Sequence, residues 1–210
     1  MTVYGEWPGQ PSQIKPFITS MMSTSQINAA QTSAIRKKLK GKTSLLYSGR
    51  LAPGKGIEVL LRAVRLVVDR GLDCQLSIVG DGVERERLQD LSASLRLEGH
   101  VVFTGAVQFD EVMVAYDQAH ILVLASNSEG WPKVVAEAMC HGVVCIGSNT
   151  GLFPWMLRDR GFTVPVDSPA ILADLLWEIA KDPQRYQMLS RAAAEGAQHV
   201  SLDGLRGARG

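Results

Sequence analysis

From residue 43 onward, short apolar runs alternate with segments whose apolar residues recur at helical spacing. The runs that predict strands are 43–48, 75–79, 101–103, 120–125 and 143–146. The helical patterns cover 55–70, 83–97, 109–119 and 131–141, with two further helices expected at 168–181 and 183–196. Such alternation is typical of a parallel sheet whose right-handed crossovers place helices on both faces. We therefore expect an α/β protein with a doubly wound parallel sheet.

The chain divides into three unequal parts. Residues 1–42 are rich in Pro, Gly, Ser, Gln and Met, and we interpret them as an N-terminal extension or linker. Within them, 27–40 predicts a helix that ends in a basic run at 36–40, interpreted as a solvated helix end rather than a membrane or partner contact. Residues 43–200 are expected to form the α/β domain, and 201–210 a truncated or disordered tail.

Bulk composition excludes several classes of protein. The formal net charge of the 210 residues is +1, whereas a general nucleic-acid binder normally has a basic excess. The three cysteines, Cys74, Cys140 and Cys145, form no C-x-x-C pair, and the four histidines are scattered. We expect buried, reduced thiols and no metal site. No apolar stretch reaches ~20 residues and no signal peptide is evident, which favours a cytoplasmic protein.

A glycine-rich segment follows the first predicted strand. Gly49, Gly54 and Lys55 fit the first seven positions of a P-loop, but Gly56 stands where Ser or Thr should ligate Mg²⁺. A nucleoside triphosphatase is therefore disfavoured. Arg50 and Lys55 nevertheless lie at a strand end beside a helix N-terminus, where two cations can hold a diphosphate without a metal. The alternative is a surface turn with two solvated charges.

Two further strand ends carry glycines. Gly80 and Gly82 form a G-x-G, but Arg85 replaces the third glycine of the dinucleotide fingerprint, so a nicotinamide or flavin enzyme is disfavoured. Gly105 and Val107 follow the next strand, in a small and nearly uncharged segment that suits a flat base. Ordinary tight turns are the alternative for both segments.

Glu129 and Glu137 lie eight positions apart, the first in a loop after a buried strand and the second one turn into the following helix. Open parallel sheets bind ligands at this edge, so the two carboxylates can contact two parts of one ligand. Solvated carboxylates near a helix N-terminus are the alternative. A glycosidase is disfavoured, because its two carboxyl groups must face each other across one bond.

Taken in order, these segments resemble a known family. Gly-Arg-Leu…Lys-Gly, Ile-Val-Gly-Asp-Gly, Phe-x-Gly-x-Val and Ser-Glu-Gly-Trp-Pro-Lys-Val-Val-Ala-Glu-Ala-Met are similar to the C-terminal, nucleotide-sugar-binding domain of family 4 (group 1) retaining glycosyltransferases. The similarity covers about residues 43–200, and its E-x7-E element is the most specific part. It implies a Rossmann-like sheet that forms one half of a GT-B fold.

The resemblance also implies roles for individual residues. Arg50 and Lys55, in the loop that begins at Gly49, would hold the donor diphosphate. Glu129 would contact the donor sugar and Glu137 the ribose. The sugar and phosphate would meet the segment Gly130, Trp131, Pro132, Lys133 and Val134, and the base and ribose would meet Gly80, Gly82, Gly105 and Val107. Enzymes of this family manage without a divalent metal, so no cofactor is expected.

Three departures from the family pattern limit what the resemblance implies. Where the family usually has Gly-Gly-x-Pro-Glu, this chain has Thr150-Gly151-Leu-Phe-Pro154-Trp155, so that loop is expected to be shifted or retuned. Residues 1–42 are too few for the N-terminal Rossmann-like domain that should precede residue 43. The helix that usually crosses back to that domain is not evident at the C-terminus.

The sequence therefore predicts the donor-binding half of a retaining, hexosyl-type glycosyltransferase that uses a UDP-, GDP- or ADP-sugar. Its partner would be the missing N-terminal domain, through which a peripheral contact with the inner face of a membrane is a further implication. Alone, the chain is expected to bind donor and to transfer little sugar. A non-catalytic nucleotide-binding or regulatory module of the same fold is the alternative, whereas a phosphorylase is disfavoured because no pyridoxal-phosphate lysine is evident.

Overall fold

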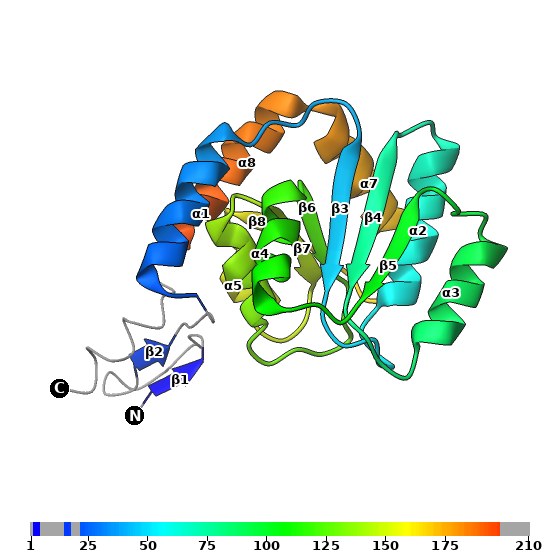
Figure 1. Ribbon diagram of the computed structural model, residues 1–210, viewed down its shortest axis with the longest axis horizontal. Coiled ribbons are helices and arrows are strands. Elements are labelled where there is room, and N and C mark those ends of the chain that lie inside the picture. Colours follow the sequence, from blue (N-terminus) through cyan, green and yellow to red (C-terminus); the bar gives the residue numbers. More distant parts are fainter. Residues whose placement is uncertain (1, 5–14, 18–21, 198–210) are drawn as a thin grey trace.

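A six-stranded, fully parallel sheet forms the centre of the molecule (Figure 1). The computed structural model describes residues 2–4, 15–17 and 22–197. The sheet order is β5-β4-β3-β6-β7-β8. Its strands are β3 (Thr43–Ser48), β4 (Cys74–Val79), β5 (Val101–Gly105), β6 (Ile121–Leu124), β7 (Val144–Ser148) and β8 (Gly161–Val164). The expected α/β, doubly wound parallel sheet is confirmed.

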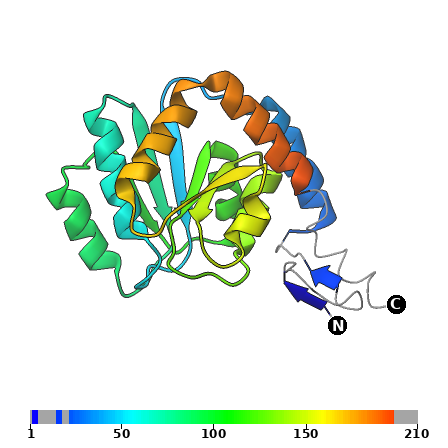
Figure 2. The ribbon, with the colours of Figure 1, turned by 180° about the vertical axis from the view of Figure 1, so that it is seen from behind.

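Helices cover both faces of this sheet. They are α1 (Thr24–Arg36), α2 (Ile57–Asp69), α3 (Arg85–Ser94), α4 (Phe109–Gln118), α5 (Lys133–Cys140), α6 (Phe153–Leu157), α7 (Pro169–Lys181) and α8 (Pro183–Gly196). Figures 1 and 2 show α4 and α5 over one face and α2, α3 and α7 over the other. The helix α8 packs against α5 and α1.

The strand order reverses between β3 and β6. The strand β3 pairs along its whole length with β4, whereas Leu45 and Leu46 pair on the other side with Ile121 and Leu122 of β6. The chain thus winds outward in one direction from β3 and in the other direction from β6. At such a switch point the two following loops diverge and leave a crevice at the carboxyl edge of the sheet.

Apolar residues at helical spacing explain how the helices attach to the sheet. In α2 the buried positions are Ile57, Val59, Leu60, Leu61, Ala63, Val64 and Val67, which form one continuous stripe. All three cysteines are buried thiols, as predicted, and burial raises the pKa of Cys74 to about 11 and that of Cys140 to about 12. Within the described ranges, no helix is long and apolar enough to cross a membrane.

The helix α1 lies within the range that the sequence assigned to an extension or linker. Ser23 caps it in a capping box, since the Gln26 amide donates to Ser23 Oγ (3.3 Å) and the Ser23 amide donates to Gln26 Oε1 (2.8 Å). Its buried residues, Ile27, Ala30 and Ala34, lie on the face that packs against α8, α5 and α4. In this structure α1 is therefore attached to the α/β domain.

One residue of the basic run departs from the prediction of a solvated helix end. Lys37 is only 8% exposed, and its ammonium donates to the carbonyl oxygens of Tyr116 and Ala119, both at 2.7 Å. These carbonyls belong to the C-terminal turn of α4, whose partial negative charge favours a cation. The prediction is wrong for Lys37 because its stem crosses the interface between α1 and α4.

The structure also contains elements that the sequence did not predict. The strand β8 has four residues and is followed by Pro165, and α6 has five residues, so neither carries enough periodicity to be recognised. A separate parallel pair joins β1 (Thr2–Tyr4) to β2 (Lys15–Phe17).

Candidate active site

A cavity of about 160 Å³ opens where β3 and β6 end. One wall is the loop after β3 and the other is the loop that leads from β6 into α5. Its lining residues are Tyr47, Ser48, Gly49, Arg50, Lys55, Leu124, Glu129, Pro132, Lys133 and Val134. The fold therefore brings together seven of the residues that the resemblance singled out, from segments about 75 positions apart in sequence.

An ion pair joins the two walls of the cavity. Lys55 Nζ lies 2.5 Å from Glu129 Oε1, and the Ser126 hydroxyl donates to the same oxygen at 3.2 Å. Both charged side chains remain partly exposed, so the pair adds at most about 1 kcal/mol to stability. An ammonium has three donors, so Lys55 can keep Glu129 and still donate to an incoming anion.

Arg50 supplies a second cation at the mouth of the cavity. Its side chain is exposed, and among the described residues its guanidinium makes no hydrogen bond or ion pair. Its backbone is fixed, because the buried Tyr47 hydroxyl donates to the Arg50 carbonyl oxygen at 2.9 Å. Burial and the nearby Glu129 charge raise the pKa of Tyr47, which keeps this donor protonated. A guanidinium on a fixed backbone suits a phosphate group.

The loop after β3 depends on the absence of a side chain at Gly56. This residue has φ +68°, and a Cβ there would lie 1.9 Å from the carbonyl oxygen of Ala125. The neighbouring Gly54 carbonyl accepts a hydrogen bond from the Asn127 amide at 2.8 Å. The loop of Lys55 and the loop of Glu129 are therefore in direct backbone contact.

Gly80 and Gly82 hold the same loop from the β4 side. A Cβ at Gly80 would lie 1.9 Å from the Gly49 carbonyl oxygen, and one at Gly82 would lie 2.2 Å from that of Leu51. The Gly80 amide also donates to the Gly105 carbonyl oxygen at 2.8 Å. These glycines permit close backbone packing against the loop that contains Arg50 and Lys55.

The structure places Val107 apart from the Lys55–Glu129 cavity. Val107 lines a hollow of about 440 Å³ between α4 and the face of β3 and β4, together with Val79 and Thr104. Gly105 lies between the two regions, with Arg85 Nη1 3.2 Å from where its Cβ would be. Gly80, Gly82, Gly105 and Val107 therefore do not line the cavity that contains Lys55 and Glu129.

Trp131 also lies outside the main cavity. It lines a smaller cavity of about 80 Å³ with Trp155, and the two ring centroids are 6.2 Å apart. Trp155 belongs to the segment 150–155, which was expected to be shifted or retuned relative to the family pattern. Gly130 is exposed, and a Cβ at Gly151 would lie 2.3 Å from the Glu129 carbonyl oxygen. The retained Gly151 therefore lets its loop pack against the backbone of Glu129.

Glu137 lies below the cavity rather than in its lining. It is 3% exposed, one turn inside α5, and its Oε2 accepts a hydrogen bond from the Tyr116 hydroxyl at 3.2 Å. Tyr116, Tyr47 and Ser126 were not predicted to be part of the site. The two tyrosines lie in a helix and a strand whose apolar patterns already account for a buried residue, and Ser126 is a small residue in the loop after β6, so no sequence signal marked them.

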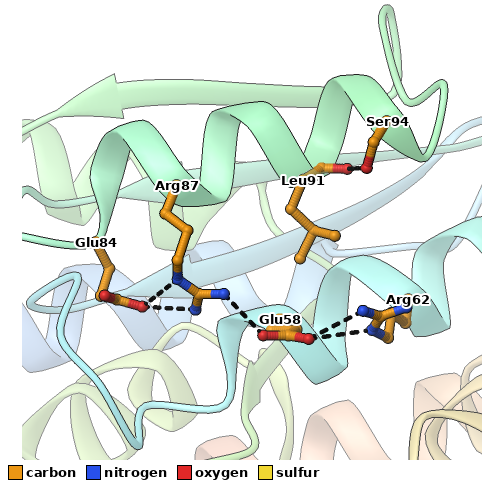
Figure 3. Close-up of polar contacts among 6 residues, drawn as sticks. All are labelled: Glu58, Arg62, Glu84, Arg87, Leu91 and Ser94. Atoms are coloured by element: carbon orange, nitrogen blue, oxygen red, sulfur yellow. Dashed lines mark hydrogen bonds and ion pairs between the residues drawn. The ribbon is translucent and has the colours of Figure 1, made fainter.

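A second hollow, of about 340 Å³, lies on the other side of the Lys55 loop, between α2 and α3. Figure 3 shows four of its charged residues paired with one another: Arg87 bridges Glu84 and Glu58, and Glu58 also accepts from Arg62. The hydrogen bonds from Arg87 and Arg62 lower the pKa of the Glu58 carboxyl. Because these charges neutralise one another, this hollow is less suited to an anion than the cavity beside Arg50.

A parallel sheet with two cations and a helix N-terminus at its switch point is the arrangement that the resemblance implies. Residues 30–196 match the model of the family "Glycosyl transferases group 1", and the chain belongs to that family. The expected family is confirmed, as is the expectation that the fold is one half of a GT-B fold.

The curated relatives are glycosyltransferases with more than one name. The D-inositol 3-phosphate glycosyltransferase of Streptomyces avermitilis is 31% identical over 75% of this chain and 36% of its own length. The alpha-D-kanosaminyltransferase of Streptomyces kanamyceticus is 28% identical over 86% of this chain and 49% of its own length. The chain thus spans about a third to a half of the length of these relatives.

Solved structures share the fold. The C-terminal domain of the group 1 glycosyl transferase LpcC from Francisella tularensis has a TM-score of 0.70 and 21% identity, over 83% of this chain and 95% of that domain. Anabaena HepE in complex with UDP and glucose has a TM-score of 0.77 and 18% identity, over 96% of this chain and 57% of HepE.

Proposed function

We propose that this chain is the donor-binding half of a retaining glycosyltransferase, and that it holds a nucleotide-sugar in the crevice between β3 and β6. The observation that carries the proposal is the cavity at the switch point, where Arg50 and Lys55 from one loop face Glu129 from the other. A nucleoside diphosphate sugar has one anionic centre between two hydroxyl-rich ends. Two cations beside Glu129, with the buried carboxylate of Glu137 one turn inside α5, suit that pattern.

The same residues suit the chemistry of transfer. As the bond between the sugar and the diphosphate breaks, negative charge grows on the departing diphosphate. Arg50, Lys55 and the N-terminus of α5 at Lys133 are in place before that charge develops, so they stabilise the transition state more than the ground state. Glu129 accepts hydrogen bonds from the hexosyl hydroxyls and Glu137 from the ribose. No divalent metal is required, because the cations replace it.

The donor is a UDP-, GDP- or ADP-sugar, and UDP is the first candidate because the structural neighbour HepE was solved with UDP and glucose. The acceptor is bound outside the crevice that these residues form. Since the curated relatives are roughly twice as long, we propose that the 210-residue chain alone binds donor and transfers little sugar. Robust transfer by the purified chain would contradict this part of the proposal.

Calorimetric titration with UDP, GDP and ADP in the presence of EDTA tests the binding site. At least one should bind, and Arg50→Ala and Lys55→Ala should each weaken it roughly 10- to 100-fold, since a hydrogen bond to a charged group contributes about 1.5–3 kcal/mol. Arg191→Ala removes an exposed cation from α8, away from the crevice, and should leave the affinity unchanged.

Three results would count against the proposal. Absence of binding for all three nucleotides would favour a module that has kept the fold without the function. Equal losses in the Arg50 and Arg191 variants would mean that general charge, not the crevice, attracts the nucleotide. Binding that disappears with EDTA would show that a metal, not the pair of cations, holds the diphosphate.

A further inference from the structure

Among the tyrosines whose side chains the structure describes, Tyr116 is the one whose hydroxyl donates a hydrogen bond to a carboxylate. The residue lies in α4 and is 0% exposed, and its hydroxyl donates to Glu137 Oε2 at 3.2 Å. Tyr116 therefore contacts the carboxylate that the proposed function assigns to the ribose.

The surrounding elements hold Tyr116 in place. Its carbonyl oxygen accepts the hydrogen bond from the buried ammonium of Lys37 at 2.7 Å. Its ring packs against the ring of His141, with centroids 5.6 Å apart, and His141 Nδ1 lies 2.7 Å from Asp117 Oδ1. The backbone and the ring of Tyr116 are thus fixed by α1 and by the end of α5, so its hydroxyl presents a fixed donor.

A glutamate carboxylate needs such a donor to keep one orientation. The last torsion of a Glu side chain is broad and has no strong intrinsic preference. A carboxylate that is to accept from both ribose hydroxyls must have its plane aligned with them before the ligand arrives. The hydroxyl of Tyr116 fixes one oxygen of Glu137 and thereby the plane of the group.

We propose that Tyr116 is a positioning residue that aligns the Glu137 carboxylate with the donor ribose. The inference rests on the proposed function, because it takes the occupant of the crevice to be a ribonucleotide. It extends that function to a residue on a different helix, one that never touches the ligand. It also makes recognition of ribose hydroxyls, rather than of the diphosphate, the property that depends on Tyr116.

The test compares affinities for UDP and for 2′,3′-dideoxy-UDP, with GDP or ADP and the matching dideoxy forms if UDP does not bind. The wild-type chain should prefer the ribonucleotide, and Glu137→Gln should lose that preference. Tyr116→Phe keeps the buried ring and should reduce the preference roughly tenfold, while its affinity for the dideoxy form stays near the wild-type value. Tyr186→Phe is the matched control, since Tyr186 is equally buried, lies in α8 and has a hydroxyl that makes no hydrogen bond within the described residues.

The possible outcomes distinguish a failure of this inference from a failure of the proposed function. If no nucleotide binds to the wild-type chain, the proposed function and the inference both fail. If nucleotides bind but Tyr116→Phe keeps the ribose preference, or weakens both forms equally, Tyr116 is structural only and the inference alone fails. Should Tyr116→Phe not fold, the tyrosine Cζ NMR signal of Tyr116 in the wild-type chain must shift more with UDP than with dideoxy-UDP, and equal shifts would overturn the inference.

Discussion

At the scale of single residues, the site depends on glycines, whose lack of a Cβ atom allows the backbone to pack closely. Gly54 and Gly56 flank Lys55 and have similar backbone angles, φ +78° and φ +68°. A Cβ at Gly54 would meet nothing within 4 Å, whereas one at Gly56 would collide with Ala125. The two positions therefore separate backbone strain from contact between the loops.

Gly56→Ala is expected to destabilise the chain clearly more than Gly54→Ala. An alanine in the left-handed region costs about 1–2 kcal/mol at either position, and only Gly56→Ala must also push the Lys55 loop away from Ala125. In thermal unfolding, each kcal/mol corresponds to roughly 2–4 °C for a chain of this size. Gly56→Ala should in addition lose nucleotide affinity, and equal midpoints and affinities for the two variants would show that the contact between the loops is unimportant.

At the scale of elements, the end of α1 is attached to α4 by the buried ammonium of Lys37. Burial lowers the pKa of Lys37 from 10.5 to about 8, against the attraction of Asp117, which raises it. Between these two values the unfolded chain binds more protons at this position than the folded chain does. The contribution of Lys37 to the free energy of unfolding therefore rises with pH across that window.

Lys37→Met should remove this pH dependence. Between pH 8 and 10.5 the free energy of unfolding of the wild-type chain should rise relative to that of the variant, by up to about 3 kcal/mol over the whole window. Urea unfolding at pH 7, 8, 9 and 10 measures the difference, in which the cysteines and tyrosines common to both chains cancel. A difference that is flat, or that falls with pH, would contradict the buried environment of Lys37.

The helices and strands also show how much of the fold could be predicted from the sequence. Long periodic segments such as α2 and α7 were predicted with bounds close to those observed, because their apolar stripes are long. The short β8 and α6 were not predicted, since four or five residues contain too little of either period. The burial of Lys37 could not be predicted either, because the sequence of a basic run at a helix end is the same whether its side chains extend into solvent or contact a neighbouring helix.

The candidate site was also predicted only in part. The sequence pointed to Arg50, Lys55 and Glu129, which the fold places around one cavity, because each follows a strand at the same edge of the sheet. It could not show that Trp131 turns toward Trp155, or that Tyr116 reaches Glu137 across two helices. Those contacts depend on how helices pack over the sheet, which the spacing within one segment does not encode.

At the scale of the whole molecule, one topological fact organises the rest. The strand order reverses between the parallel strands β3 and β6, so the loops after these strands diverge and leave a crevice. The family match over residues 30–196 and the shared fold of the LpcC domain fit this arrangement. The central claim is that a nucleoside diphosphate occupies this crevice, with its diphosphate between Arg50 and Lys55.

A crystal structure of the 210-residue chain with the nucleoside diphosphate that binds most tightly tests this claim most directly. The account predicts diphosphate density contacting Arg50, Lys55 and the N-terminus of α5, with the ribose hydroxyls on Glu137 and the Tyr116 hydroxyl still on that carboxylate. Density in the hollow between α2 and α3, or along the face of β4 under α4, with the Arg50 cavity empty, would contradict it.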